Sequence, residues 1–266
     1  MGITTALHPF APDHRATVSA IREPASRNAA RCQTSCQTCS LRELCLPAGL
    51  GVQEIEQLDR IVHRKRSLQR GEYLYRAGGT LQSLYAVRIG FLKSCVMHED
   101  GREQVVGFHM MGELLGMDAI GSRQHLCDAI ALENCELCEF PFGDLERLSH
   151  VLPTLQQQFH RIISREIARD YGVMLLLGSM RAEERLATFL LNLSQRFAAR
   201  GYSASEFNLR MTREEIGSYL GLKLETISRV LSRFDEEGLI EVRGKFIRIV
   251  RMDALRALIG QHACQT

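Results

Sequence analysis

Residues 212–250 restrict the possible folds of this chain more than any other stretch of its sequence. Thr212 and Glu215 have the spacing of a capping box, in which each side chain satisfies a free backbone amide at a helix start. We expect this first helix to end at a tight turn at Gly221 and a second helix to follow over residues 224–236. The spacing therefore predicts a helix-turn-helix.

The second helix of this motif has one apolar and one polar face. The apolar stripe, predicted to be buried, contains Ile227, Val230, Leu231 and Phe234. The exposed face carries Glu225, Ser228, Arg229, Ser232 and Arg233. Arginine can bond bidentately to guanine, glutamate can accept from the cytosine amine, and serine can approach a thymine methyl group. With a hairpin over residues 239–242 and 246–250, the pattern predicts a winged helix-turn-helix that binds DNA.

Composition limits how the chain can bind nucleic acid. Its net charge of +2 is too small for a polycation, so DNA binding must depend on a local patch. Residues 1–31 lack the apolar core of a signal peptide, and no run of 18 apolar residues occurs. We expect a cytoplasmic protein without a membrane partner, in which residues 1–31 form a mobile tail.

Four of the nine cysteines lie close together, at Cys32, Cys36, Cys39 and Cys45. Thiols stay reduced in the cytoplasm, so spaced cysteines indicate a metal or redox site in preference to disulfides. Thiolates gathered by a short segment suit either tetrahedral zinc or one face of an iron-sulfur cube, and the spacing does not choose between them. If a metal binds, we expect Cys36, Cys39 and Cys45 to supply three ligands.

The fourth ligand is either Cys32 or a distant cysteine. Cys135 and Cys138 lie three apart in a strand-like run, so their side chains should point to opposite faces and only one should reach a common site. The remaining cysteines are interpreted as small buried or incidental thiols: Cys95, Cys127 and Cys264.

Short strands broken by glycines characterise residues 71–142. Residues 84–97 alternate in polarity, Asp100 and Gly101 supply a hairpin turn, and residues 105–108 return. This spacing predicts an antiparallel barrel or roll.

The longest helical stretch covers residues 155–177, opening after Pro153 and closing at Gly178. Its heptad seam contains Ile163, Ile167, Asp170, Met174 and Leu177. We expect this seam to pair with a second copy of the chain. Two Asp170 carboxylates brought together across a twofold axis would repel and be costly to desolvate, so the dimer should be marginal. The alternative is a helix packed on its own domain, with Asp170 at a solvent edge.

Several stretches together resemble the FNR branch of the CRP/FNR transcription regulators, over roughly residues 32–258. They are Cys36-Gln-Thr-Cys39 through Cys45, Ser83-Leu-Tyr-Ala-Val-Arg88, Gly107-Phe-His109, Asp118-Ala-Ile-Gly-Ser122, Ala131-Leu-Glu133 through Cys138-Glu-Phe-Pro141, Ala182-Glu-Glu-Arg-Leu186 and Leu224-Glu-Thr-Ile-Ser-Arg229. The resemblance implies an oxygen-labile 4Fe-4S cluster, and it selects Cys138 over Cys32 as the fourth ligand. The implied ligands are Cys36, Cys39, Cys45 and Cys138.

The same resemblance implies an α+β fold with an N-terminal antiparallel β-roll, a long dimerisation helix and a C-terminal winged helix-turn-helix. The expected divisions are a tail (1–31), a cysteine-rich segment (32–46), the β-roll domain (47–150), the dimerisation helix (151–180), the DNA-binding domain (181–258) and a C-terminal tail (259–266).

Partners also follow from the resemblance. It implies that Glu225, Ser228 and Arg229 contact bases in an inverted repeat of TTGAT, and that the loop of residues 98–104 touches RNA polymerase. The chain departs from its relatives at Lys223, where Thr or Ser often caps the second helix. Losing that cap should cost about 1 kcal/mol, unless Lys223 instead meets a DNA phosphate. We include Lys223 and Arg233 in the predicted DNA-binding set.

Cyclic-nucleotide binding occurs elsewhere in this family and requires an Arg-Ser pair after the segment that matches Gly112 and Glu113. Residues 124–128 offer no such pair, so we expect no cyclic nucleotide. The predicted function is a non-enzymatic oxygen sensor that dimerises when its cluster is intact and controls genes of anaerobic metabolism. A zinc- or thiol-based redox sensor on the same scaffold is the alternative. An iron-sulfur enzyme or electron carrier lacks support, because no nucleophile-base pair or nucleotide-binding glycine motif is present.

Overall fold

The computed structural model describes residues 35–62, 64–98 and 100–259, and the statements below concern these residues. In chain order the elements are η1 (Cys36–Thr38), η2 (Arg42–Leu44), α1 (Val52–Ile61), β1 (Arg64–Leu68), β2 (Tyr73–Tyr75), β3 (Ser83–Ile89), β4 (Phe91–Met97), β5 (Glu103–Met110), β6 (Leu114–Leu115), η3 (Met117–Ala119), β7 (Asp128–Ala131), β8 (Cys135–Pro141), α2 (Phe142–Val151), α3 (Pro153–Ser179), α4 (Ala182–Ala198), β9 (Glu206–Asn208), α5 (Arg213–Leu220), α6 (Leu224–Glu236), β10 (Ile240–Arg243), β11 (Phe246–Ile249) and α7 (Met252–Ala257).

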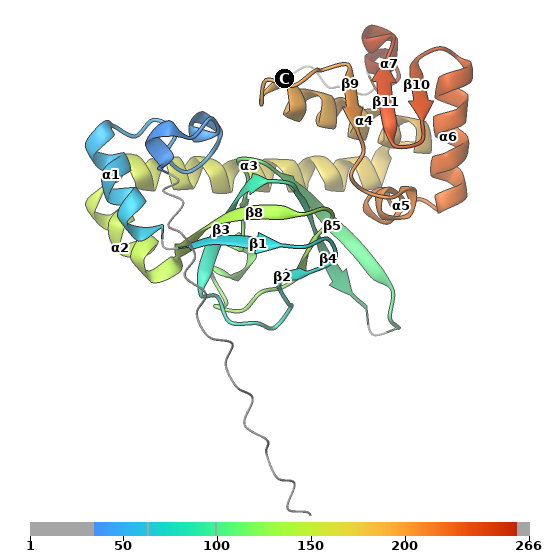
Figure 1. Cartoon of the computed structure of the whole chain (residues 1–266). Coiled ribbons are helices and arrows are strands. Elements are labelled where there is room, and N and C mark those ends of the chain that lie inside the picture. Colours follow the sequence, from blue (N-terminus) through green and yellow to red (C-terminus); the bar gives the residue numbers. More distant parts are fainter. Residues whose placement is uncertain (1–34, 63, 99, 260–266) are drawn as a thin grey trace, which may run out of the picture. The chain divides into compact units, whose positions relative to one another are not determined.

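Two four-stranded antiparallel sheets form the β-roll (Figure 1). Their strand orders are β1-β8-β3-β6 and β2-β7-β4-β5. Side chains from both sheets meet in one apolar cluster, to which β3 contributes Val87, β4 Leu92 and β8 Leu137. The antiparallel roll predicted from the sequence is therefore confirmed.

The run over residues 84–97, predicted to alternate in polarity, contains two strands that turn at Gly90. Gly90 has φ +96°, and a Cβ there would lie 2.6 Å from the Cys135 sulfur, so only glycine fits. The expected alternation in burial is also absent, because the first five residues of β3 and of β4 are all buried. Leu84 and Phe91 pack outward, into apolar clusters on the other side of the sheets.

Helix α3 is 27 residues long, two residues longer at each end than predicted (Figure 1). Pro153 begins it, since a first-turn residue needs no amide hydrogen, and the helix continues through Gly178. Leu155 and Ile162 bury one side of its N-terminal half, together with Leu145 of α2. Within the described ranges, no helix is both long and apolar enough to span a bilayer.

The C-terminal part is a winged helix-turn-helix, as predicted. Helix α6 has the predicted bounds, and its predicted buried stripe is buried: Ile227, Val230, Leu231 and Phe234. The wing hairpin of β10 and β11 turns at Gly244, and β9 adds a third strand that the sequence analysis did not predict. Helix α4 ends at Ala198.

Candidate functional site

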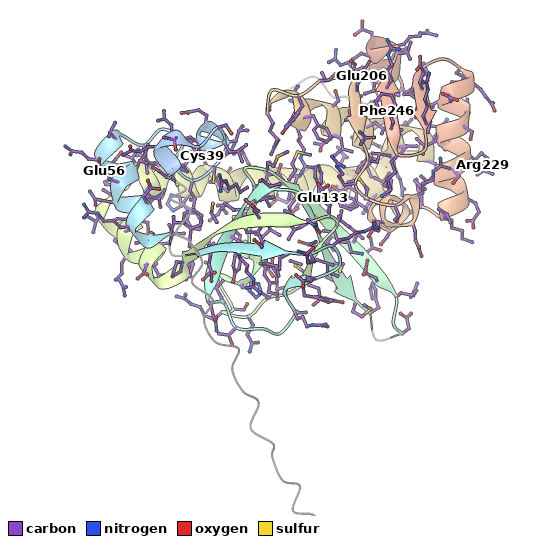
Figure 2. All side chains as sticks on the ribbon, in the orientation of Figure 1. Cys39, Glu56, Glu133, Glu206, Arg229 and Phe246 are labelled. Carbon is purple, nitrogen blue, oxygen red and sulfur yellow. The ribbon has the colours of Figure 1, made fainter. Side chains whose placement is uncertain are left out.

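The cysteine-rich segment is attached to helix α1 through Asp59. The Ser35 hydroxyl donates to one Asp59 carboxylate oxygen at 2.7 Å, and the Cys36 amide donates to the other at 2.8 Å. Figure 2 shows Cys39 in this segment and Glu56 on α1, and the Gln37 side-chain amide donates to Glu56 at 3.4 Å. Asp59 thus fixes the start of the segment, a role that sequence spacing alone did not reveal.

Three of the predicted ligands pack against one apolar cluster: Cys36, Cys45 and Cys138. Burial raises the pKa of Cys36; Asp59 raises it further, and smaller contributions come from Cys45 and Cys138. Burial raises the pKa of Cys45 to about 12, with additions from Cys138 and Cys39. These thiols are therefore electrostatic neighbours, although Cys138 lies more than ninety residues further along the chain.

Cys135 and Cys138 occupy opposite faces of β8, as predicted. Cys135 lies in the apolar cluster between the two sheets and donates to the Phe91 carbonyl oxygen, whereas Cys138 packs on the outer cluster. Cys95 and Cys127 are buried and free. Cys32 and Cys264 lie outside the described residues.

The cysteines do not form a closed ligand set in this structure. Across the described part of the chain, no three His, Cys, Asp or Glu side chains converge closely enough to hold a metal ion. None of the seven described cysteines is in a disulfide, and the four predicted ligands are of the soft type that iron-sulfur clusters and zinc prefer. The donor chemistry fits such a group.

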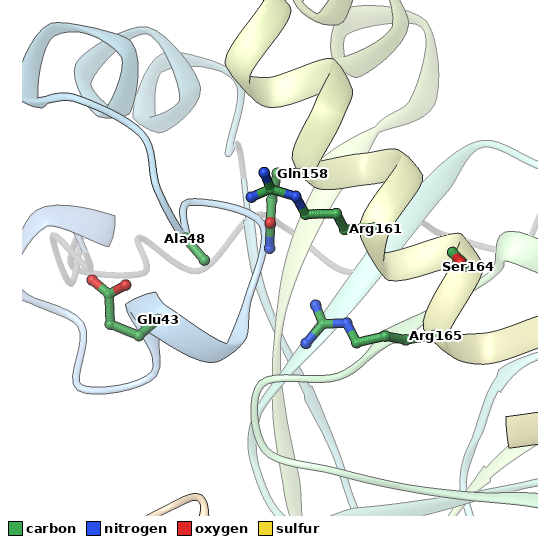
Figure 3. A pocket seen from close by; sticks show the side chains of 6 residues that line it. All are labelled: Glu43, Ala48, Gln158, Arg161, Ser164 and Arg165. Carbon is green, nitrogen blue, oxygen red and sulfur yellow. The ribbon is translucent and has the colours of Figure 1, made fainter. Parts of the chain in front are cut away.

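The cysteine segment also contacts helix α3. The Gln158 side-chain amide donates to the Cys45 carbonyl oxygen at 3.2 Å, and Gln158 is buried. Leu46, which follows Cys45, is fully buried in the cluster that includes Leu155 of α3. Figure 3 shows the adjoining pocket, in which Gln158 and Arg161 reach from α3 toward the segment that carries Glu43. Cys45 is thus in direct contact with α3, and a change in its conformation would alter that contact.

The middle of α3 presents an exposed apolar stripe. Ile167 is 47% exposed and Met174 58% exposed, and Asp170 lies between them on the surface. Tyr171 and Leu175 are also exposed and widen the stripe. The predicted heptad seam did not include these two residues, although they stand four residues apart. Ile163, Ile167 and Asp170 also line a pocket against the β-roll, and Leu177 lies next to the turn after α5. Such a stripe is typical of a helix that pairs with another helix.

The turn between α5 and α6 has the geometry that the sequence predicted. The Glu215 amide donates to the Thr212 hydroxyl at 3.1 Å, and the Thr212 amide donates to the Glu215 carboxylate at 2.7 Å. Gly221 adopts φ +62°, and a Cβ on Gly217 would lie 2.5 Å from the Leu222 carbonyl oxygen. Gly221 therefore suits the left-handed turn, and a side chain at Gly217 would clash with the backbone of that turn.

The predicted DNA-binding residues fall into two groups. Lys223, Glu225 and Arg229 are exposed and make no ion pair with any residue that the structure describes. Lys223 occupies the N-cap of α6 without a side-chain cap hydrogen bond, as its residue type implies. In contrast, Ser228 accepts from Arg213 at 3.2 Å, and Arg233 pairs with both Glu183 and Glu237.

A buried ion cluster links the loop after β5 to helices α3 and α4. Glu113 pairs with Arg196 at 2.6 Å, with Arg200 at 2.7 Å and with Arg169 at 3.7 Å. Burial alone would raise the pKa of Glu113, but Arg196 and the other two arginines outweigh it and lower the pKa to about 2. The carboxylate in the Gly112-Glu113 segment is thus already engaged within the chain.

Helix α5 is held against the β-roll by polar contacts. Lys93 of β4 pairs with Glu103 at 2.6 Å and with Glu215 at 3.0 Å. The Ser218 hydroxyl donates to the Glu103 carbonyl oxygen and accepts from the Val105 amide. None of these contacts was predicted, and those made by Glu215 and Ser218 join residues more than a hundred positions apart.

The sequence matches the models of two domain families. Residues 184–258 match the Crp-like helix-turn-helix domain, and residues 65–150 match the cyclic nucleotide-binding domain. The first match covers the winged helix and α4, and the second covers the β-roll.

Whole-chain relatives are more specific. The chain is 51% identical over 229 residues to the fumarate and nitrate reduction regulatory protein of Escherichia coli (strain K12), covering 86% of this chain and 92% of that protein. It is 50% identical over 230 residues to the fumarate nitrate reduction regulatory protein of Klebsiella oxytoca, with the same coverage. Among solved structures, FixK2 from Bradyrhizobium japonicum is 28% identical with a TM-score of 0.70, covering 76% of this chain and 98% of that chain.

Proposed function

Because this chain belongs to the CRP/FNR family of transcription regulators, we propose that it controls genes of anaerobic metabolism in response to oxygen. Membership of this family makes it a DNA-binding regulator and not an enzyme. The finer proposal is that a 4Fe-4S cluster, intact only without oxygen, lets two copies of the chain pair and bind DNA. The printed names of the relatives, which refer to fumarate and nitrate reduction, support the anaerobic role.

One observation carries the proposal. Cys138, on strand β8, is an electrostatic neighbour of Cys36 and Cys45, on a segment that contacts α3 through Gln158. We propose that Cys36, Cys39, Cys45 and Cys138 hold the cluster. When bound, the cluster would supply oxygen-sensitive iron-sulfur bonding between the segment and the β-roll. The segment would carry the change to α3 through its contacts at Cys45 and Leu46.

Dimerisation through α3 and base recognition by α6 complete the proposal. The exposed stripe around Ile167 and Met174 would pair with its copy in a second chain, and Asp170 would keep that pairing marginal. Glu225, Ser228 and Arg229 would contact bases of an inverted repeat, and Lys223 and Arg233 would contact the DNA phosphate backbone. The loop of residues 98–104 would contact RNA polymerase; Glu99 within it lies outside the described residues.

Anaerobic purification of the full chain tests the cluster. We expect brown protein that contains iron and sulfide, sediments as a dimer and binds an inverted repeat of TTGAT. Cys138→Ser should lose both the colour and the dimer, whereas Cys135→Ser, on the other face of the same strand, should keep both. Colourless, iron-free wild-type protein that still binds the repeat as a dimer would refute the proposal. Bound zinc would favour the zinc-based sensor.

A further inference from the structure

Arg185, near the start of α4, bonds the ends of two other helices. Its guanidinium donates from Nε to the Met180 carbonyl oxygen at 2.9 Å, from Nη2 to the Leu177 carbonyl oxygen at 2.9 Å and from Nη1 to the Leu220 carbonyl oxygen at 3.0 Å. Leu177 and Met180 mark the end of α3, and Leu220 is the last residue of α5. One side chain therefore joins α3, which carries the exposed stripe, to α5, the first helix of the helix-turn-helix.

The chemistry of this contact depends on arginine. The last carbonyl groups of an α-helix have no partner within the helix, and the negative end of the helix dipole favours a nearby cation. A guanidinium offers five donors in a rigid planar fork, so it can serve three carbonyl groups on two helices at once. A lysine would keep the charge, but its compact ammonium cannot reproduce the planar fork.

The contact lies directly beside the turn that aims α6. A Cβ on Gly221 would approach both the Arg185 Nη1 atom and the Leu177 side chain at 3.3 Å. Helix α6 begins three residues after Gly221, so the position of this turn sets the direction of α6. Leu177 also belongs to the predicted dimer seam, and the seam and the turn therefore meet at Arg185.

We propose that Arg185 is a positioning residue that fixes the orientation of α6 relative to α3. Two copies of α6 must reach half-sites about 34 Å apart on DNA, so a small rotation at this joint would misalign both sets of base contacts. Non-specific binding depends on phosphate charge and tolerates such a rotation, whereas base readout does not. Arg185 thus contributes to sequence-specific binding without touching DNA.

The test compares Arg185→Lys with wild type and with Arg256→Lys, a control on the surface of the same domain whose ion pair with Asp253 is exposed. All three are studied as full chains without oxygen, by sedimentation and by anisotropy with two duplexes. One duplex carries an inverted repeat of TTGAT, and the other has the same composition in scrambled order. We expect Arg185→Lys to remain dimeric, to bind the scrambled duplex as wild type does, and to bind the repeat at least about tenfold more weakly, or 1.4 kcal/mol.

Three results would overturn the inference. The first is equal affinity of Arg185→Lys and Arg256→Lys for the repeat. The second is an equal loss of affinity for both duplexes, which would mean that Arg185 contributes only to non-specific electrostatic binding. The third is faster hydrogen exchange throughout α4, α5 and α6, which would indicate general unfolding; the inference requires faster exchange confined to the turn around Gly221.

The inference rests on the proposed function, in that α3 pairs two copies and α6 reads an inverted repeat. The two fail separately in this experiment. Wild-type protein that does not bind the repeat as a dimer would count against the proposed function. Wild-type protein that does so, while Arg185→Lys is unaffected, would count against the role of Arg185 alone.

Discussion

Replacing Glu113 with glutamine should destabilise the contact between the β-roll and helices α3 and α4 by roughly 3 kcal/mol. The pKa of Glu113 is lowered from its usual value of 4.5 to about 2, and each pKa unit corresponds to about 1.36 kcal/mol. A second argument gives a loss of stability of the same size. Removing one partner of a buried ion pair typically costs about 3–5 kcal/mol, because the other charge stays buried without compensation.

Arg200 should account for much of this cost. Its side chain is only 5% exposed, and burial lowers its pKa despite the contact with Glu113. In the Glu113→Gln variant the arginine would keep a neutral oxygen as acceptor but would lose the opposite charge. Both arginines would keep backbone acceptors, Arg196 at the Phe108 carbonyl oxygen and Arg200 at the Met111 and Arg196 carbonyl oxygens, so the cost lies in the lost opposite charge.

Urea unfolding of the full chain, followed by circular dichroism at pH 7, measures this effect. Glu241→Gln is the matched control, because Glu241 pairs with Arg243 and Arg248 on the exposed wing, and such surface pairs are worth about 0–1 kcal/mol. Equal losses in the two variants would refute the reasoning. The pH dependence is a further check: a carboxylate with a lowered pKa stabilises the fold above pH 4.5, and this stabilisation is lost as the pH falls toward 2.

Three further predictions concern dimerisation, base readout and acid stability. Asp170→Ala should dimerise and bind the inverted repeat in air, since the repulsion across the pair is removed; a variant that sediments as a monomer in air would contradict this. Arg229→Ala should lose about 1–3 kcal/mol of discrimination at one base pair, measured by anisotropy on singly substituted duplexes, and Arg233→Ala should lose less because Arg233 already pairs with Glu183 and Glu237. Burial and, to a smaller extent, the nearby Arg169 lower the pKa of His109 to about 3. Below about pH 6.5 the unfolded chain therefore binds a proton at this histidine that the folded chain does not bind. Wild-type protein should therefore melt at a lower temperature at pH 5.5 than at pH 7.5, and His109→Asn should show a smaller difference by calorimetry.

The elements that the sequence predicted best are those with local signals. The capping box at Thr212, the left-handed glycine at Gly221 and the helical spacing of Ile227 and Phe234 all lie within a few residues of what they determine. Strand β9 has no such signal, because its three residues become a strand only by pairing with β11. Helix α2 did have a signal, in the three-residue spacing of Phe142, Leu145 and Leu148, which went unused.

The candidate site was predictable to the extent that its chemistry is carried by residue type. Cysteine spacing indicated three thiol ligands, and strand geometry separated Cys135 from Cys138. The residues that hold the site in position carry ordinary surface chemistry in the sequence. Asp59, Gln158 and Arg185 look like solvated polar residues, and only the tertiary contacts with Cys36, Cys45 and Leu220 give them a role.

Helix α3 contacts every part of the proposed switch. Its N-terminal half receives the cysteine segment through Gln158, its middle exposes the stripe around Asp170, and its last carbonyl groups are bonded by Arg185. A single helix of 27 residues is about 40 Å long, which is enough to join these three places. A displacement imposed at one end therefore reaches the stripe and the DNA reader together, so the state of the cysteines, the pairing of two chains and the direction of α6 should change in concert.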